Sequence, residues 1–127
     1  MLNSIMVVGI GTDIIEIERV KNAINNKHFV ERVYTVKEQN YCESRGRQAA
    51  ASYAARFAGK EAFFKALGTG IVCSLTDVEI LNDDLGCPHV LLTGKAIELF
   101  DRLKAKKIHI SISHSKDYAV ATCIIEN

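Results

Sequence analysis

The chain has 127 residues, a formal net charge of +1, and 48% hydrophobic and 24% charged residues. This length suits one domain with a substantial hydrophobic core, so we expect residues 1–127 to form a single domain. The near-neutral charge excludes a global field that would attract nucleic acid or a membrane surface, and a charged partner must therefore meet a local patch.

No stretch approaches the roughly 20 apolar residues that cross a bilayer. Residues 5–10 are apolar but lack the charged flank and the length of a secretory signal. The cysteines contain no C-x-x-C pair, so their spacing does not indicate a zinc motif; they are Cys42, Cys73, Cys87 and Cys123. We expect a reduced, cytoplasmic protein without a membrane segment, in which cysteines mostly fill core space.

Residues 5–12, IMVVGIGT, predict a β-strand because they are mostly apolar and partly β-branched. Gly9 and Gly11 weaken a strand, and two of them suggest a bulge or a close approach of another backbone. A helix is expected from about residue 15 to 25. Asp13, just before it, has two interpretations: a helix N-cap, or a metal carboxylate that needs a second carboxylate from elsewhere.

A G-x-G after a strand also raises the hypothesis of a dinucleotide-dependent oxidoreductase. The fingerprint is incomplete, because Ile14 stands where a third small residue is needed and no second βαβ unit follows. We therefore retain it only as a weak alternative.

Residues 27–47 mix basic and acidic side chains with a few apolar anchors. Such a mixture is usual for a solvated face, but together with Arg19 and Lys21 it also suits a basic rim for an acidic partner. A helix is expected from near Thr35 through Tyr41. Residues 48–67 then predict a long, alanine-rich helix.

The end of that helix, RFAGKEAFFKALGTG (56–70), has an unusual pattern. Gly68 can take the left-handed conformation that caps a helix. One arc is mostly small and suits close packing against other backbone: Ala58, Gly59, Ala62, Phe63 and Ala66. The opposite arc interleaves large apolar side chains with four charged ones, Arg56, Lys60, Glu61 and Lys65. These charges either pair, as in an i,i+4 Glu61–Lys65 pair, or face a charged ligand.

The remaining sequence predicts strands around one further helix. Strands are expected at 76–81 and 89–92, joined by a turn at 82–86, and at 108–113 and 118–125, joined at 114–117; a helix is expected at 95–106. These elements indicate an α+β fold in which an antiparallel sheet packs against helices.

His114 follows the strand at 108–113, where an exposed side chain without a function is the simplest interpretation. A serine hydrolase that uses Ser111, Ser113 and His114 is not favoured, because the G-x-S-x-G elbow is missing. Adjacent residues of a strand also point to opposite faces of the sheet.

Three stretches resemble the signature regions of the 4'-phosphopantetheinyl transferases, and the similarity is closest to their short bacterial type. They are GIGTDIIEIER (9–19), RFAGKEAFFKALGTGI (56–71) and HISISHSKDYAVA (109–121). The similarity follows the whole chain in order and includes the turn at Gly86-Cys87-Pro88. The resemblance implies that family's fold and its reaction, which moves the phosphopantetheine arm of coenzyme A onto a serine of apo acyl carrier protein in fatty acid biosynthesis.

The resemblance also implies a divalent ion, usually Mg²⁺, the release of adenosine 3',5'-bisphosphate, and a homotrimer with active sites between subunits. Carried over by position, it implies metal ligation and catalysis by Asp13 and Glu61, catalysis and pyrophosphate binding by Lys65, coenzyme A binding by Arg56, Lys60, Gly68, His114 and Ser115, and carrier-protein docking by Arg19 and Lys21. Glu61, directly or through a bound water, is the expected general base for the serine proton.

The residue types agree with this assignment, since Mg²⁺ favours carboxylate, phosphate and water oxygens. Two departures stand out: Asn25, Asn26 and Lys27 lie where family members often have more arginines, and Ile15 replaces an acidic residue used by a larger relative. The alternative function is a non-catalytic module that binds coenzyme A or an acidic protein.

Overall fold

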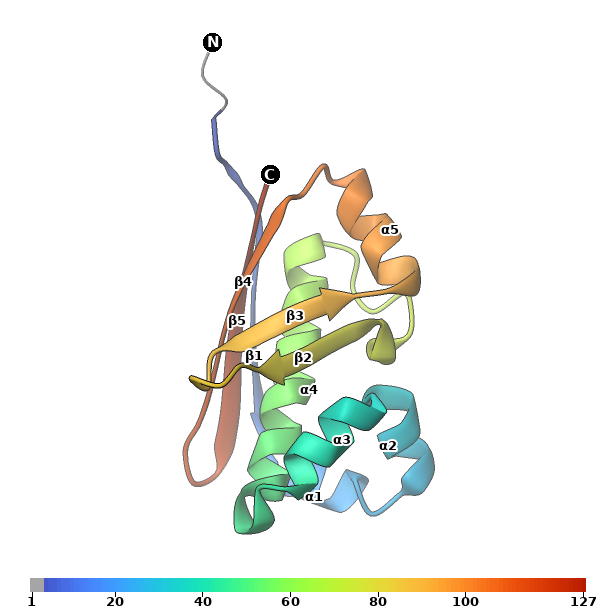
Figure 1. Ribbon diagram of the computed structural model, residues 1–127, viewed down its shortest axis with the longest axis vertical. Helices are drawn as coiled ribbons and strands as arrows, with labels where there is room; N and C mark the ends of the chain where they lie inside the picture. Colours follow the sequence, from blue (N-terminus) through green and yellow to red (C-terminus); the bar gives the residue numbers. More distant parts are fainter. Residues whose placement is uncertain (1–3) are drawn as a thin grey trace.

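The computed structural model describes residues 4–127 and has a three-stranded antiparallel sheet along one side. The sheet order is β1 (Val7–Glu16), β5 (Tyr118–Glu126), β4 (Lys107–His114), so β1 and β4 are its two edges. The long helix α4 (Ala49–Leu67) lies along one face of this sheet (Figure 1). The expected α+β class is confirmed.

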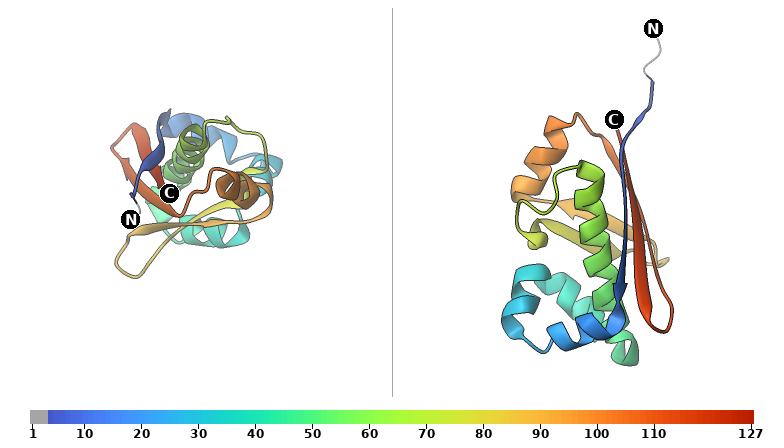
Figure 2. Two further views of the ribbon diagram at one scale, coloured as in Figure 1. Left: turned by 90° about the horizontal axis from the view of Figure 1, so that it is seen from above. Right: turned by 180° about the vertical axis from the view of Figure 1, so that it is seen from behind.

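The other elements surround α4 on the side away from the sheet and at its ends (Figure 2). They are the helices α1 (Ile17–Ala23), α2 (Lys27–Val33), α3 (Val36–Glu43) and α5 (Gly94–Arg102), the hairpin β2 (Val78–Asn82) and β3 (Pro88–Leu92), and the 3₁₀ turns η1 (Gly46–Gln48) and η2 (Leu75–Asp77). Among the described residues, none of the helices combines the length and the apolar character needed to cross a membrane.

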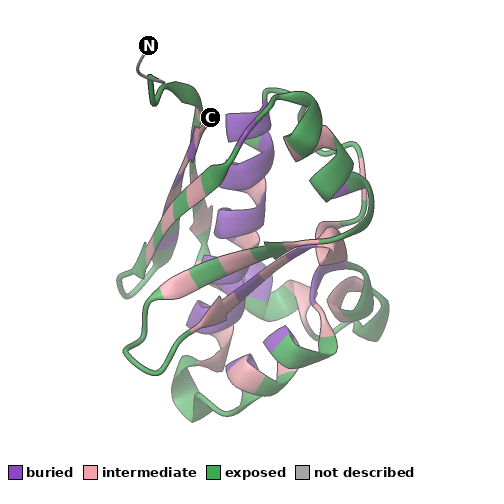
Figure 3. Ribbon diagram, turned by 45° about the horizontal axis from the view of Figure 1, so that its top comes forward, coloured by how far each residue is buried: buried purple, intermediate pink, exposed green. Residues whose placement is uncertain are grey.

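The core forms around α4, which is buried on nearly all sides (Figure 3). Small side chains allow this, because they let neighbouring elements approach the helix axis on several flanks. A Cβ atom added at Gly59 would lie only 2.6 Å from Ile80 Cδ1 of β2. The small arc expected from the sequence therefore packs closely, as its composition predicts.

The strand β1 presses directly on the backbone of α4. A Cβ atom at Gly9 or Gly11 would overlap the carbonyl oxygens of Ala66 and Ala62, respectively. The pairing register of β1 with β5 also shifts between Val7 and Gly9. Both expected reasons for the two glycines, a close approach and an irregularity, are thus present.

Two local expectations were wrong. Asp13 is not a helix N-cap: it lies within β1, opposite Ala121 of β5, and α1 begins only at Ile17. Residues 27–33, for which the sequence predicted a solvated face or a basic rim but no helix, form the helix α2; the Asn26 side chain caps it by accepting from the backbone N–H groups of His28 and Phe29. The expectation of a helix beginning after Thr35 is confirmed, and Thr35 and Glu38 form a capping box.

The cysteines divide between the core and the surface. Cys42 and Cys123 are fully buried, and burial raises the pKa of the Cys123 thiol to about 12. Cys73 is half-buried, while Cys87 is exposed in the turn between β2 and β3. Core filling therefore accounts for two of the four thiols.

Lys60 and Glu38 form an ion pair that is completely shielded from solvent. Lys60 Nζ donates to Glu38 Oε1 at 2.8 Å and to the carbonyls of Leu75 and Val78 at 2.9 and 2.6 Å. The other Glu38 oxygen accepts from the backbone N–H of Ile80 at 2.8 Å. Burial lowers the pKa of Lys60, and the Glu38 carboxylate opposes that shift.

This arrangement corrects the assignment of Lys60 to coenzyme A binding. An ammonium group has three N–H donors, and each of them already has a partner inside the protein. Lys60 thus joins α4 to α3 and to the hairpin.

We expect Lys60→Met to lower the free energy of unfolding by about 3–5 kcal/mol, because it leaves the Glu38 carboxylate buried without its counter-ion. The exposed Lys27–Glu31 pair, at 3.8 Å, supplies the control: Lys27→Met should lower the free energy of unfolding by less than about 1 kcal/mol. Urea unfolding at one fixed protein concentration measures both. Equal midpoints for the wild type and Lys60→Met would contradict the structural role.

Candidate active site

Asp13, Glu61 and Lys65 gather where β1 crosses α4. Asp13 lies on the face of β1 that carries Gly9 and Gly11, and its side chain is only 15% exposed. Lys65 Nζ donates to Asp13 Oδ1 at 3.1 Å and to the carbonyl of Thr12 at 2.9 Å. Lys65 therefore pairs with the neighbouring strand rather than forming the i,i+4 pair with Glu61 that the sequence also allowed.

Glu61 is half-buried one helical turn before Lys65. Its pKa is raised, first by burial and then by the negative charge of Asp13, while Lys65 acts in the opposite direction. Two carboxylates that repel each other at a partly buried position favour a cation between them. The donor set fits Mg²⁺, which prefers carboxylate oxygens and whose site is completed by water and phosphate oxygens.

A pocket of about 200 Å³ lies at the opposite edge of the sheet, beside β4. Arg56 forms its buried wall, with Nη1 3.1 Å from Ser52 Oγ, Nη2 3.0 Å from Asn82 Oδ1, and the guanidinium 4.4 Å from the Tyr41 ring centroid. Its Nε has no hydrogen-bond partner within the described part of the chain. Among residues 4–127, no carboxylate forms an ion pair with Arg56, so its charge is free to meet an anion.

His114 connects this pocket to a second, more open hollow. It lines both, and the second hollow also contains Lys21, Arg47, Ser115 and Lys116. The structure therefore brings together His114 and Ser115, predicted to bind coenzyme A, and Lys21, predicted to dock the carrier protein. Arg19 is exposed on α1 but does not line this hollow.

The predicted site residues thus fall into two groups at opposite edges of the sheet. Asp13, Glu61 and Lys65 lie at the β1 edge, whereas Arg56 and His114 lie at the β4 edge, with β5 between them. Gly68, in the left-handed conformation at φ 77°, follows Lys65 and lies about 18 Å along the helix axis from Arg56. One chain alone does not place all the predicted groups around one ligand.

The sheet face turned away from α4 is exposed and carries apolar side chains from β1 and β5. They include Ile10 (65% exposed), Ile14 (63%), Tyr118 (46%) and Val120 (41%). Alternation along each strand explains the pattern, since the intervening residues face α4. An exposed apolar patch of this kind is characteristic of a protein interface.

Comparison with known proteins identifies the class to which this fold and site belong. The model of the 4'-phosphopantetheinyl transferase superfamily matches residues 9–123. The holo-[acyl-carrier-protein] synthase of Ruminiclostridium cellulolyticum is 51% identical over 120 residues, covering 91% of this chain and 90% of the relative. The chain belongs to the 4'-phosphopantetheinyl transferase superfamily.

Solved structures agree. A Bacillus anthracis holo-(acyl-carrier-protein) synthase in complex with CoA (3',5'-ADP) superposes with a TM-score of 0.81 at 39% identity, covering 96% of this chain and 98% of that one. A Helicobacter pylori holo-[acyl-carrier-protein] synthase in complex with coenzyme A gives 0.80 at 30% identity, with coverages of 91% and 98%. The fold is that of this superfamily.

Sequence reasoning missed several pocket residues. Tyr41 was seen only as a helix end, Asn82 only as part of a turn, and Arg45 only as one charge in a mixed segment. The charged residues at 27–47 did include a member of the pocket, Arg45. In the structure, Arg45 and Arg56 both lie near the ring of Tyr41. Their convergence depends on tertiary packing and has no local motif.

Proposed function

We propose that the protein is a holo-[acyl-carrier-protein] synthase, one domain over residues 1–127. It transfers the 4'-phosphopantetheine group of coenzyme A to a serine of apo acyl carrier protein and releases adenosine 3',5'-bisphosphate, in fatty acid biosynthesis. The observation that carries this proposal is the cluster of Asp13, Glu61 and Lys65 in a chain of this superfamily. The free thiols support a cytoplasmic location.

In this reaction the serine Oγ forms a bond to the phosphorus that carries the pantetheine, and the bond from that phosphorus to the leaving phosphate oxygen breaks. Glu61 accepts the serine proton. Lys65 Nζ, held at Asp13, places a positive charge beside the pyrophosphate oxygens. Mg²⁺ held by Asp13 and Glu61 would neutralise charge on the pyrophosphate and orient it for in-line attack.

The pocket at the β4 edge is proposed to hold the anionic part of coenzyme A. Arg56 offers a guanidinium that pairs with no carboxylate of residues 4–127, Arg45 lies 5.8 Å from the same Tyr41 ring, and His114 lines the opening. Arginine recognises phosphate well because its planar N–H groups match phosphate oxygens.

We further propose a homotrimer in which each site combines the β1 edge of one subunit with the β4 pocket of the next. Two features support this. The catalytic and binding groups lie at opposite edges of the sheet within one chain, and the exposed apolar outer face of the sheet would be buried by contact with another subunit. A heterologous contact of this kind joins two different surface patches. Repeated contacts form a closed ring when the rotation from one subunit to the next divides a full turn evenly.

The basic hollow that contains Lys21, Arg47 and Lys116 is proposed, together with Arg19, to dock the carrier protein. Acidic partners are attracted to such a rim over a Debye length of about 8–10 Å. The docking surface lies next to His114, so the incoming serine would arrive near bound coenzyme A.

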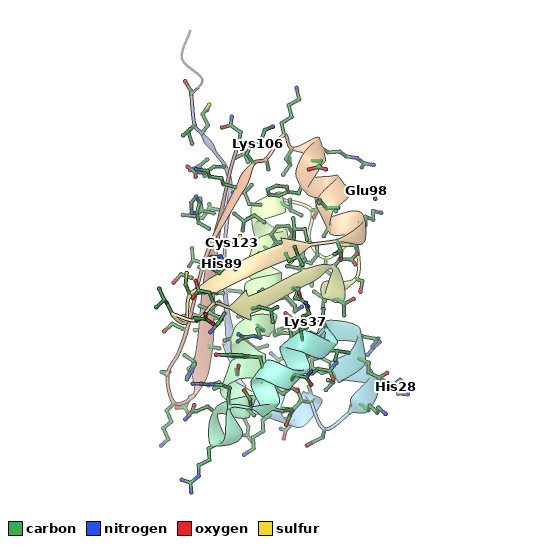
Figure 4. All side chains as sticks on the ribbon, viewed as in Figure 1. His28, Lys37, His89, Glu98, Lys106 and Cys123 are labelled. Atoms are coloured by element: carbon green, nitrogen blue, oxygen red, sulfur yellow. The ribbon has the colours of Figure 1, made fainter. Side chains whose placement is uncertain are left out.

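Intact mass of apo acyl carrier protein tests the reaction. Incubation with the protein, coenzyme A and Mg²⁺ should add one phosphopantetheine group, and EDTA should abolish the gain. Asp13→Asn and Glu61→Gln should each lower kcat by at least about 100-fold, since each removes a charge from the reacting centre. Glu98→Gln, on the outer side of α5 (Figure 4), is the control and should keep normal activity. Binding of coenzyme A without turnover would instead favour the binding-module alternative.

Mixing variants tests the shared site. Asp13→Asn inactivates the metal-binding group at the β1 edge, and the double variant Arg45→Ala/His114→Ala removes two side chains of the coenzyme A pocket at the β4 edge. Co-refolded at equal amounts, they should recover up to about a quarter of wild-type activity, because about one interface in four then combines two intact halves. If each chain held a complete site, the mixture would show only the mean of the two parent activities.

Carrier-protein docking is tested by Arg19→Glu. We expect KM for the carrier protein to rise roughly threefold to tenfold with little change in kcat, because a rim charge affects encounter more than chemistry. Raising the salt concentration should likewise raise the KM of the wild-type enzyme for the carrier protein. Arg102→Glu, in the last turn of α5, is the matched charge reversal elsewhere. A salt-independent KM would argue against this docking surface.

A further inference from the structure

The tip of the β2–β3 hairpin gathers three side chains that are common metal ligands. Asp83, Cys87 and His89 are all exposed, and one potential ligand atom from each lies within 4.8 Å of the other two. The turn is closed by backbone bonds from Asp83 N to Cys87 O and from Gly86 N to Asp83 O, both 2.9 Å. None of these side chains belongs to either half of the proposed active site. Figure 4 shows His89 on the hairpin.

The hairpin already orients the Asp83 carboxylate. Its Oδ1 accepts the backbone N–H groups of Leu85 and Cys87, both at 2.9 Å. Its Oδ2 is thereby directed at His89 Nε2, 2.9 Å away. Ligating carboxylates are typically fixed by such hydrogen bonds in the shell around a metal, so the turn provides one ligand in position and a second in contact with it.

We propose that Asp83, Cys87 and His89 form a binding site for a thiophilic divalent cation, with Zn²⁺ as the best match. A thiolate, an imidazole and a carboxylate are all zinc ligands, and tetrahedral coordination leaves a fourth position for water. Ligand atoms around zinc lie about 3.3–3.8 Å apart, so only small side-chain movements are needed. The two negative ligands neutralise the ion, whereas Mg²⁺ is disfavoured because it prefers oxygen ligands.

The spacing of this site, Asp-x₃-Cys-x-His with a single thiol, does not match a zinc motif built on cysteine pairs. It becomes visible only when the hairpin folds the turn back on itself. It does not depend on the proposed reaction, although Gly86 and Pro88, the neighbours of Cys87, line the Arg56 pocket.

Cobalt substitution tests the proposal on the full-length protein. Co²⁺ added to the reduced protein in excess Mg²⁺ should bind one thiolate-ligated ion per chain and give a sulfur-to-cobalt charge-transfer band with intense tetrahedral visible bands. Zn²⁺ should remove both bands by displacement, whereas excess Mg²⁺ should leave them. Zn²⁺ should also slow alkylation of Cys87, as located by peptide mass analysis.

Variants identify the ligands. Cys87→Ser should abolish the charge-transfer band, His89→Ala should weaken cobalt affinity at least about tenfold, and Asp83→Asn should do likewise while keeping the oxygen that closes the turn. Cys73→Ser is the control for a second accessible thiol, and Asp13→Asn is the control for the proposed magnesium site. Absence of the charge-transfer band in the wild type, or its persistence in Cys87→Ser, would overturn the proposal.

Discussion

The buried pair of Lys60 and Glu38 is the constraint on which the arrangement around α4 depends. Charges in a dry interior are tolerated only when every donor and acceptor is matched, and this pair meets that demand with partners from η2 and β2. One ammonium group therefore fixes how α3 and the hairpin lie against α4. Those two elements supply Tyr41 and Asn82, so the shape of the Arg56 pocket follows from an interaction that no ligand touches.

Much of the fold could be predicted because its signals are local. Alternation marked β4, the alanine-rich run marked α4, and Thr35 marked the start of α3. Lys60 was misjudged because its partner lies 22 residues away in sequence, and burial rather than residue type decides whether a lysine can meet a ligand. Asp13 was ambiguous for a similar reason: β1 continues beyond it to Glu16, since β5 pairs with the whole strand.

The candidate site shows the same division between local and distant information. Its charged residues could be found from the sequence because they interrupt an apolar helix, but their sorting into two groups depends on which flank of α4 each one meets. Arg56 and Glu61 are only five residues apart, yet they serve different edges of the sheet. In the proposed trimer, this division would let two copies of a 127-residue chain together surround a ligand as long as coenzyme A.

The close contact between β1 and α4 sets a register. Moving β1 by one residue would place the Cβ of Ile10 or Thr12 where Gly11 now meets the carbonyl of Ala62, and this steric conflict forbids the slip. Asp13 lies two residues beyond Gly11 on the same face of β1. The register that the glycines impose therefore also fixes the position of Asp13 near Glu61. Besides burial, the negative charge of Asp13 raises the pKa of Glu61, so the two carboxylates repel each other, and the register set by the glycines, together with the ion pair from Lys65, holds Asp13 near Glu61 against this repulsion.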